Sequence, residues 1–430
     1  MPERHDALVV GAGPAGTATA LRLAAAGHRV LVVDKARFPR AKCCSEYASP
    51  ATVQELERLG VLGSITRLGT APLTGSSIHT DRGDLLRGRF PGGATGLALP
   101  RREVDAALLA AVRAQGIPVM EGRRLEALAP TRDGGITATL QSGGIRTTVR
   151  ARVVIGADGL RSRVARHAGG VRRARLARLA IVTHVAQVDG LGDAAELHVG
   201  PRGYVGLNRI RPGQVNLALV VPASEASHLR TDPAAYLRHR VRSWPALAER
   251  IHTTEIGDAV MVTGPFDHRA RRSTGHGMAL VGDAADFFDP FTGEGIWAAL
   301  VGARLLADTL VPLLHDDRPI HDAALAPYRR ARRRQFAGKW LVERVIGHAM
   351  QQPALFRAAV RRLDHAGLGD TAIGICGDCV PVQALLSPRV LGRLVMGDKR
   401  RATGDGHPPR MTALTTHDSR LTTNGSRFHG

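Results

Sequence analysis

The chain opens with a strand that runs directly into a glycine loop, ALVVGAGPAG over residues 7–16, and an Ala/Leu-rich stretch follows. The G-x-G-x-x-G spacing between a strand and a helix predicts a dinucleotide-binding turn. Gly11 permits the tight turn, Gly13 lets a pyrophosphate approach the backbone, and Gly16 lets helix and strand pack closely. The helix N-terminus, with Ala15 in its first turn, offers unpaired N–H groups to the anion.

The second apolar strand, RVLVV over residues 29–33, leads into Asp34 and Lys35. A carboxylate at the end of this strand, about twenty residues after the loop, can accept hydrogen bonds from a ribose diol. We therefore count Asp34 and Lys35 among the cofactor residues. The alternative is a glycine-rich turn without a ligand, which the combination of strand, helix and terminal acid disfavours.

Length and composition are those of an ordinary globular protein, with 430 residues of which 44% are hydrophobic and 23% charged. No run approaches the ~18–20 apolar residues of a membrane-spanning helix. The first strand begins too early to leave room for a signal or transit peptide. Four cysteines are too few for a disulfide framework and fit a reducing compartment. We therefore expect a cytoplasmic protein.

The net charge of +21 comes from arginine, because only four of the 59 basic residues are lysines. The arginines are spread along the chain, aromatic residues make up only 4%, and no nucleic-acid-binding signature occurs, so we expect no nucleic-acid partner. An anionic substrate or membrane surface suits the charge better. The arginine clusters at 161–178 and 328–334 are either solvated helical faces or points of peripheral membrane contact.

The chain divides into segments of different texture. Strands alternating with Ala-rich helices are typical of a parallel sheet, whereas runs such as IVTHVAQV (181–188) and VNLALVV (215–221) alternate as antiparallel strands do. We expect residues 1–175 and 265–312 to form the first and second parts of a nucleotide-binding domain, with an antiparallel-sheet substrate domain at 176–264 between them. A C-terminal helical region follows at 313–396, and a disordered tail at 397–430.

A second Gly-Asp site lies far downstream, where the apolar strand ALV (279–281) ends in Gly282-Asp283 and DPFTGEGI (289–296) precedes a helix. Two such sites on one cofactor require a long one. The combination resembles the FAD-dependent oxidoreductase superfamily of aromatic hydroxylases, flavin-dependent halogenases and geranylgeranyl reductases. The resemblance implies FAD as the cofactor, with its ribityl chain at Asp283 and the flavin beside the second loop. The residues it adds to the FAD site are Gly282, Asp283, Pro290, Gly293, Gly295 and Ile296.

The implied fold is α/β: an FAD-binding Rossmann-type, para-hydroxybenzoate-hydroxylase-like domain with an inserted antiparallel β-sheet and C-terminal helices. Two further motifs match this superfamily. LPRREVD (99–105) fits its R-x-x-[LFV]-D pattern, so Arg101, or else its neighbour Arg102, contacts FAD; a surface arginine at a helix start is the alternative. For VVIGADGLRS (153–162), the resemblance implies that Asp158 helps to bind FAD and NAD(P)H, and a strand-to-helix turn with a helix cap is the alternative.

The resemblance implies a flavoenzyme, but the cofactor motifs do not separate its reactions. We favour a monooxygenase that uses NAD(P)H, as a transient electron donor, and O2 to hydroxylate an aromatic or polyketide-derived, lipophilic substrate. A partner reductase is the alternative electron source. The second hypothesis is a prenyl or alkene reductase of the geranylgeranyl-reductase type, and a third is a flavin-binding regulatory or scaffold protein without catalysis.

Several stretches bear on this choice. The region at 203–210 lacks the Trp blocks of halogenases and geranylgeranyl reductases, whereas FPRAKCCSEYASP (38–50) resembles the K-x-C-G-E-x-x-S-P loop of reductase-like members. The C-terminal helical region, with the stretches GDCVP (377–381) and LSPRVL (386–391), resembles phenolic-lipid hydroxylases associated with type III polyketide synthases. Tyr204 and Asn208 are candidate substrate residues, and no catalytic residue is assigned.

The cysteines leave more than one interpretation open. Cys376 and Cys379 have C-x-x-C spacing, which marks a redox dithiol or half of a zinc site. The second half would have to come from Cys43 and Cys44, whose adjacency suits tetrahedral zinc poorly. We expect ordinary packing thiols and no bound metal.

Overall fold

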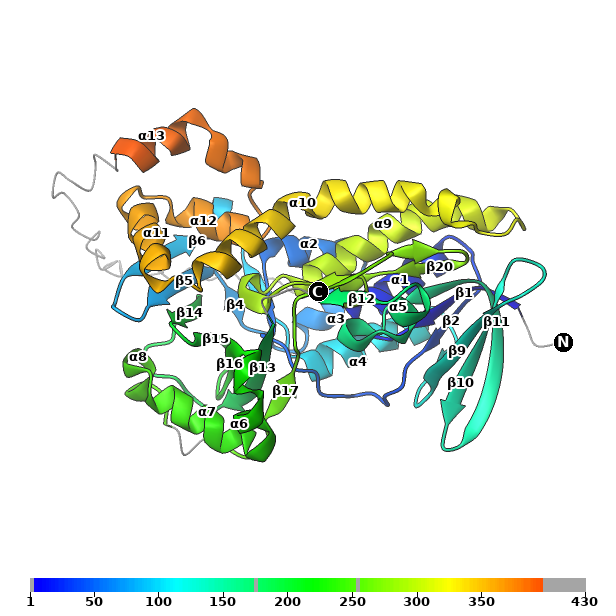
Figure 1. The fold of residues 1–430 in the computed structure, drawn as a ribbon, viewed down its shortest axis with the longest axis horizontal. Coiled ribbons are helices and arrows are strands. Elements are labelled where there is room, and N and C mark those ends of the chain that lie inside the picture. The colour runs from blue at the N-terminus through cyan, green and yellow to red at the C-terminus, as the bar shows by residue number, and fades with distance from the viewer. Residues whose placement is uncertain (1–3, 174–176, 253–255, 397–430) are drawn as a thin grey trace, which may run out of the picture.

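The computed structural model describes residues 4–173, 177–252 and 256–396, in which helices surround two large β-sheets (Figure 1). The first sheet has eight strands, and the neighbours β20, β11, β1, β2 and β8 all pair in parallel. Its strands are β1 (Arg4–Val10), β2 (Val30–Val33), β8 (Val119–Met120), β9 (Arg124–Pro130), β10 (Ile136–Ser142), β11 (Ile145–Gly156), β19 (Thr274–Gly275) and β20 (Met278–Leu280).

The first sheet is covered on both faces, which explains its continuous apolar strands. Along β1, Val9 belongs to one buried cluster and Leu8 to another on the opposite face. The helices α1 (Pro14–Ala25), α4 (Arg101–Ala114) and α9 (Gly295–His315) contribute to the cluster that contains Val9. The Ala-rich sequence of α1 allows it to pack closely, and Pro14 starts the helix at a position where no N–H bond is lost.

The second sheet has seven strands in the order β17-β13-β16-β15-β14-β5-β6. The predicted alternating strands pair antiparallel, with Ile181 opposite Leu219. Its strands are β5 (Gly75–Thr80), β6 (Leu85–Arg89), β13 (Arg178–Val185), β14 (Ala195–Gly200), β15 (Gly203–Arg211), β16 (Gln214–Pro222) and β17 (Met261–Thr263). The short helices α6 (Ala226–Thr231), α7 (Pro233–Arg242) and α8 (Pro245–Ala248) pack on it through a cluster around Leu237 and Trp244. The predicted α/β fold is confirmed, and the second sheet is antiparallel except for one parallel pair, β5 with β14.

The domain boundaries expected from the sequence do not match the membership of the two sheets everywhere. Strands β5 and β6 lie within residues 1–175, yet they belong to the second sheet, where β5 pairs in parallel with β14. This pairing joins Ile78 to Leu197, more than a hundred residues apart, so the local pattern of β5 does not reveal it. The remaining strands and helices are β3 (Tyr47–Ala48), β4 (Pro72–Leu73), β7 (Gly96–Ala98), β12 (Val171–Arg173), β18 (His268–Ala270), β21 (Asp286–Phe287), α2 (Pro50–Arg58), α3 (Leu62–Thr66) and α5 (Arg163–His167).

Helix α9 corrects the expectation that no segment is long and apolar enough to cross a membrane. Its 21 residues meet that criterion by length and composition, and it is the one helix in the described residues that does. More than half of its most apolar stretch is buried inside the protein, and Leu300 and Leu306 belong to the core of the first sheet. The helix of a buried core passes the same test, and the packing of α9 is of that kind.

The chain ends in the helices α10 (Ala326–Ala349), α11 (Pro353–His365), α12 (Gly369–Cys376) and α13 (Pro388–Met396). Helix α12 covers the edge strand β6, where a Cβ at Gly369 would overlap the carbonyl oxygen of Arg87. The backbone N–H of Arg89 donates to Asp370 Oδ1 at 2.8 Å. Covering this edge protects it from pairing with another chain. The predicted disordered tail, 397–430, lies outside the described residues.

Candidate active site

A cavity of about 720 Å³ is lined by the first sheet, the second sheet and the C-terminal helices together. It gathers all the residues predicted above for the cofactor and the substrate except Gly16 and the alternative arginine, Arg102. The predicted residues that line it are Gly11, Gly13, Ala15, Asp34, Lys35, Arg101, Asp158, Tyr204, Asn208, Gly282, Asp283, Pro290, Gly293, Gly295 and Ile296. Segments about 270 residues apart in the sequence therefore share one site.

The three glycines of the first loop have different structural roles: two allow close backbone contacts and one leaves space open. A Cβ at Gly16 would overlap the carbonyl oxygen of Gly11, and a Cβ at Gly11, whose φ is +109°, would overlap that of Ala157. At Gly13 the nearest atom to a Cβ would be Arg40 Nη2, 3.6 Å away. Gly11 and Gly16 therefore allow the backbone to close, whereas Gly13 keeps space open beside the N-terminus of α1.

Asp34 holds this loop in place. Its Oδ2 accepts a hydrogen bond from the N–H of Ala12 and its Oδ1 accepts one from the N–H of Ala36, both at 2.8 Å. The side chain is buried at the cavity wall. Each carboxylate oxygen can accept a further bond, so the interaction with a diol remains available.

The downstream loops meet the first one. Gly282 has a φ of +62°, and a Cβ there would lie 2.9 Å from the Cβ of Ala15 in α1. Gly293 has a φ of +73°, and a Cβ there would lie 2.5 Å from the ring of Tyr47. His268 Nε2 donates to the carbonyl oxygen of Asp283 at 2.7 Å. Both loops therefore require glycine to approach their neighbours.

Arg101 is buried at the cavity wall, whereas Arg102 is exposed and does not line the cavity. The Arg101 guanidinium donates to both carboxylate oxygens of Asp105, at 2.9 and 2.8 Å. Arg40 lies 3.0 Å from the same carboxylate. The geometry therefore favours Arg101 over Arg102 as the arginine that would contact the cofactor. The bonds to Asp105, on the same helix, hold the Arg101 side chain in place.

Asp158 combines the two interpretations given to it. Its Oδ2 accepts a 2.6 Å hydrogen bond from the N–H of Arg163 at the start of α5, as a cap does. Its Oδ1 is buried and has no hydrogen-bond partner among the described residues. Burial raises the pKa of this carboxyl group. An unpartnered oxygen at a cavity wall is available to a donor from a bound molecule.

These observations fit FAD. Open backbone at Gly13, beside a helix N-terminus without an acidic side chain, suits a pyrophosphate. Asp34 suits a ribose, and the glycine loops of η5 (Gly282–Ala284) and of Gly293–Gly295 continue the same cavity. The residues present would thus hold a cofactor that extends from the first loop to the second.

The opposite wall comes from the second sheet and is mostly aliphatic, with Ser76, Glu196 and Thr263 as further polar lining residues. Its aliphatic members are the side chains of small and medium apolar residues on four strands: Ile78, Ala180, Val182, Leu197, Ala218 and Val220. The two candidate substrate residues on β15 use their polar atoms internally. Tyr204 donates its hydroxyl to Asp289 Oδ1 at 2.7 Å, and Asn208 Nδ2 donates to the carbonyl oxygen of Glu46 at 3.4 Å. Both side chains therefore tie the wall to other parts of the chain, Tyr204 to Asp289 and Asn208 to Glu46.

The loop at residues 42–46 connects the two walls, because Cys44 packs against the core of the first sheet and Cys43 against the cluster that contains Val182 and Val220. Sequence reasoning missed the residue that anchors this loop. Glu46 has a φ of +55°, a conformation that costs a non-glycine residue about 1–2 kcal/mol. Its carboxylate lies 2.7 Å from His184 Nε2, accepts from Asn216 Nδ2 at 3.3 Å and accepts from the backbone N–H of Arg101 at 2.8 Å. The glutamate of the loop motif was the available signal, but its partners lie far away in the sequence.

All four cysteines are free thiols. Cys43 and Cys44 line the cavity, and so does Cys376, but Cys379 does not. Burial raises the pKa of Cys43 to about 12, with a smaller contribution from Cys44. Burial also raises the pKa of Cys376 to about 12. Cys43 and Cys376 therefore stay protonated at neutral pH, which does not suit an exchange-active dithiol.

A buried charged cluster beside the second glycine loop was also missed. Lys339 Nζ lies 3.1 Å from Asp378 Oδ2 and 3.2 Å from Glu343 Oε1, and it donates to Thr292 Oγ1 at 3.2 Å. Glu294, in the loop itself, is buried and raised in pKa to about 8, first by burial and then by the charge of Asp378. Lys339 is one of only four lysines in an arginine-rich chain, which was the one sequence signal.

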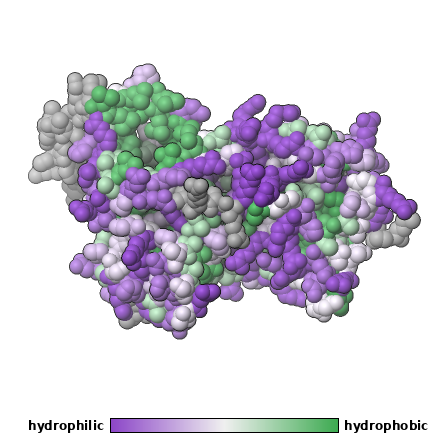
Figure 2. Space-filling view, in the orientation of Figure 1, coloured by the Kyte–Doolittle hydropathy of each residue, from purple (hydrophilic) through white to green (hydrophobic). Residues whose placement is uncertain are grey.

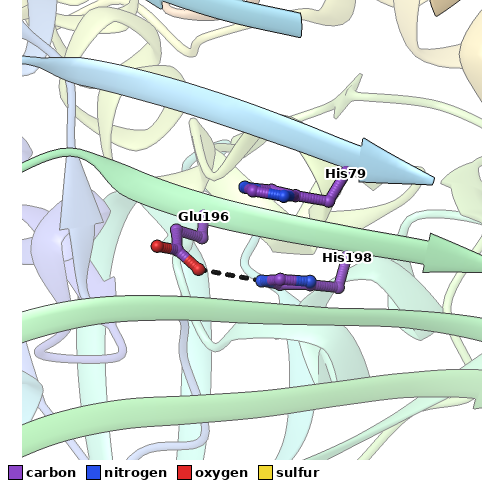
Figure 3. A group of neighbouring side chains, drawn as sticks. All are labelled: His79, Glu196 and His198. Atoms are coloured by element: carbon purple, nitrogen blue, oxygen red, sulfur yellow. Dashed lines mark hydrogen bonds and ion pairs between the residues drawn. The ribbon is translucent and has the colours of Figure 1, made fainter. Parts of the chain in front are cut away.

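One group among the described residues has the composition of a metal site: His79, Glu196 and His198, on β5 and β14 (Figure 3). The two imidazole rings are stacked, 4.4 Å apart and nearly parallel, so their in-plane lone pairs do not converge on one point. Both oxygens of Glu196 accept from Arg250, at 2.8 and 3.0 Å, and Oε2 also accepts from His198. The geometry favours an ion-paired network over a metal site.

Comparison with known proteins places this cavity in context. The family described as "FAD binding domain" matches residues 4–341. The menaquinone reductase of Mycolicibacterium smegmatis is 31% identical over 327 residues, covering 72% of this chain and 77% of that protein. A digeranylgeranylglycerophospholipid reductase of Methanopyrus kandleri is 31% identical over 329 residues, covering 73% and 78%. The solved structure of PqsL from Pseudomonas aeruginosa, described as a probable FAD-dependent monooxygenase, is 25% identical with a TM-score of 0.68 and covers 83% of this chain and 99% of that one.

Proposed function

This chain belongs to the FAD-binding domain family and is an FAD-dependent oxidoreductase, and from that premise we propose that it reduces carbon–carbon double bonds in a lipophilic, polyprenyl-type substrate. The sequence alone favours a monooxygenase. The curated relatives favour the alternative, because both of those described above are named reductases and one name specifies geranylgeranyl chains.

The observation that carries the proposal is the loop at residues 42–46. It brings a protonated thiol, Cys43, to the boundary between the cofactor residues and the aliphatic wall. Reduction of a double bond adds one hydride and one proton. Reduced FAD, when bound, supplies the hydride. The protein must then supply a proton at an apolar place, and the Cys43 thiol holds one there.

The chain's own residues divide the remaining tasks. The N-terminus of α1 and Gly13 would hold the pyrophosphate, Asp34 the ribose, and Asp283 the ribityl chain. The aliphatic wall would orient a hydrocarbon chain and exclude water from it. Glu46 would keep the loop closed over the site through its bonds to His184 and Asn216. Electrons would come from NAD(P)H bound transiently or from a partner reductase.

The test is anaerobic reoxidation of the flavin. Holoprotein is bleached with a stoichiometric chemical reductant, mixed with a polyprenyl lipid in detergent, and followed by flavin absorbance without O2. We expect the yellow colour to return with the unsaturated lipid and not with its fully saturated counterpart. A flavin that stays bleached with every prenyl lipid and reoxidises only with air would contradict the proposal.

Aromatic monooxygenation is the second candidate. It is supported by the similarity to PqsL and by the absence of a Trp block at residues 203–210. Under this alternative the flavin would stay reduced without O2 in the presence of a long-chain phenol. On admission of air, the phenol would gain one oxygen atom.

A further inference from the structure

The exposed apolar side chains of this protein gather near its C-terminal end. Eight large hydrophobic residues are strongly exposed in the described part of the chain, and six of them lie between residues 341 and 395. We call these six the C-terminal apolar surface: Leu341, Val345, Leu355, Leu386, Leu391 and Val395. Figure 2 shows a hydrophobic area over α13 and the segment leading into it. Apolar patches of this kind mark interaction sites on soluble proteins.

The elements that carry this surface are joined to one another. In η8 (Val382–Leu386), Val382 packs against α10, where a Cβ at Gly338 would lie 2.8 Å from its side chain. Arg362 of α11 donates to the carbonyl oxygens of Leu394 and Val395 in α13. The helices α10, α11 and α13 therefore present the apolar residues from one connected region.

The same region is strongly basic. Residues 326–396 contain twelve arginine and lysine residues against four aspartate and glutamate residues. Four of these arginines pair with aspartates outside this range, and the others still exceed the acidic residues: the pairs are Arg329–Asp322, Arg332–Asp286, Arg357–Asp81 and Arg361–Asp84. Arg389 is exposed in α13, and Arg344 is exposed in α10 next to Val345. An apolar face with basic residues around it fits the interface of an anionic bilayer. A second copy fits poorly, because each copy carries a net charge of +21.

Helix α10 connects this surface to the cavity. Its residues Phe336, Lys339, Trp340 and Glu343 line the cavity, and Arg344 both lines it and is exposed to solvent. Arg344 therefore lies at an opening of the cavity. Leu341 and Val345, of the C-terminal apolar surface, lie within one turn of it on the same helix.

We propose that the C-terminal apolar surface docks on an anionic phospholipid bilayer and that a lipid chain enters the cavity beside Arg344. The docking stands on the exposed residues and their charge. The passage of a substrate rests on the proposed function. The arginine clusters at 161–178 and 328–334 offer a membrane charge alone. The C-terminal apolar surface offers both charge and exposed aliphatic side chains, so it is the more specific candidate for membrane contact.

The experiment is co-sedimentation of the full-length holoprotein with vesicles of phosphatidylglycerol and phosphatidylcholine, or of phosphatidylcholine alone. We expect binding to the anionic vesicles that weakens with added salt. The double variant Leu386→Asp/Val395→Asp should bind at least tenfold more weakly, because two side chains can no longer enter the interface. Ile145→Asp is the matched control, since Ile145 is 66% exposed on β11, at the other end of the molecule, and it should bind like the parent.

A second pair of variants tests the charge. Arg389→Glu should weaken binding to anionic vesicles about fivefold or more. Arg230→Glu, at an exposed arginine on α6, should not. The proposal is overturned if the full-length protein binds no vesicles, or if the surface variants and their controls bind alike. It is also overturned if removal of residues 397–430 is needed to create binding, or if the double variant only changes the oligomeric state. None of these readouts uses turnover, so failure here is distinct from failure of the proposed reaction.

Discussion

The two walls of the cavity are built by different means. On the cofactor side the decisive contacts are between backbone atoms, as where Gly16 meets the carbonyl of Gly11. On the substrate side they are between aliphatic side chains, such as Val182 and Val220, on strands of another sheet. A backbone site tolerates almost no change at its glycines. A side-chain wall can alter its shape without altering the fold, so this family can keep FAD and vary the substrate.

The largest effect should come from glycines of the first loop, which separate folding from cofactor binding. Gly16→Val should abolish folding, because the new side chain would overlap backbone that has no room to move. Gly13→Val should fold but lose FAD, because its side chain would fill open space at the pyrophosphate site. Circular dichroism and flavin absorbance of the purified proteins distinguish the two. A yellow Gly13→Val protein would contradict the placement of the pyrophosphate.

On the substrate side, Cys43→Ala should leave the fold and FAD intact and lower turnover about a hundredfold, as expected for loss of a proton donor. Its control is Cys379→Ala, at a thiol that does not line the cavity, which should turn over normally. Steady-state rates and flavin content are measured together. Equal rates in the two variants would remove Cys43 from the reaction.

A smaller effect is expected at Asp283, whose carboxylate has no hydrogen bond within the part of the chain that the structure describes. Asp283→Ala should weaken FAD binding about tenfold, the value of one hydrogen bond to a charged group. The FAD affinity of Asp283→Asn should lie between those of Asp283→Ala and the parent protein. Equilibrium dialysis of FAD measures this, and an unchanged Kd would mean that the downstream loop does not touch the cofactor.

The smallest effect concerns the pH dependence of stability at Glu294. Its pKa is raised from 4.5 to about 8, so between these values the folded state binds more protons than the unfolded state. Stability should therefore fall as pH rises through this window. Glu294→Gln removes the titration, so the variant should gain stability relative to the parent at pH 8 and not at pH 4.5. Urea unfolding at both pH values measures this, and a gain of equal size at both would contradict it.

The cofactor wall could be predicted from the sequence because its signals are local. Gly11, Gly13 and Gly16 lie within six residues, and Asp34 follows at the end of the next strand. The loop at Gly282-Asp283 is equally compact. The geometry of such a turn requires glycines at fixed positions, and the spacing of these glycines can be seen in a single sequence.

The rest could not be predicted because its contacts are distant. Glu46 meets His184 and Asn216 across 138 and 170 positions, and no local pattern marks either pairing. The parallel pairing of β5 with β14, which assigns residues 75–89 to the second sheet, is of the same kind. The cluster around Lys339 depends on a helix that returns to the second glycine loop.

The mass of the product shows most directly whether this protein reduces polyprenyl chains. Chemically reduced holoprotein is mixed, first without O2 and then with air, with polyprenyl lipids and long-chain phenols. We expect a polyprenyl product heavier by two hydrogens, formed without O2. A phenol heavier by one oxygen, formed only in air and with the polyprenyl lipids unchanged, would contradict this prediction.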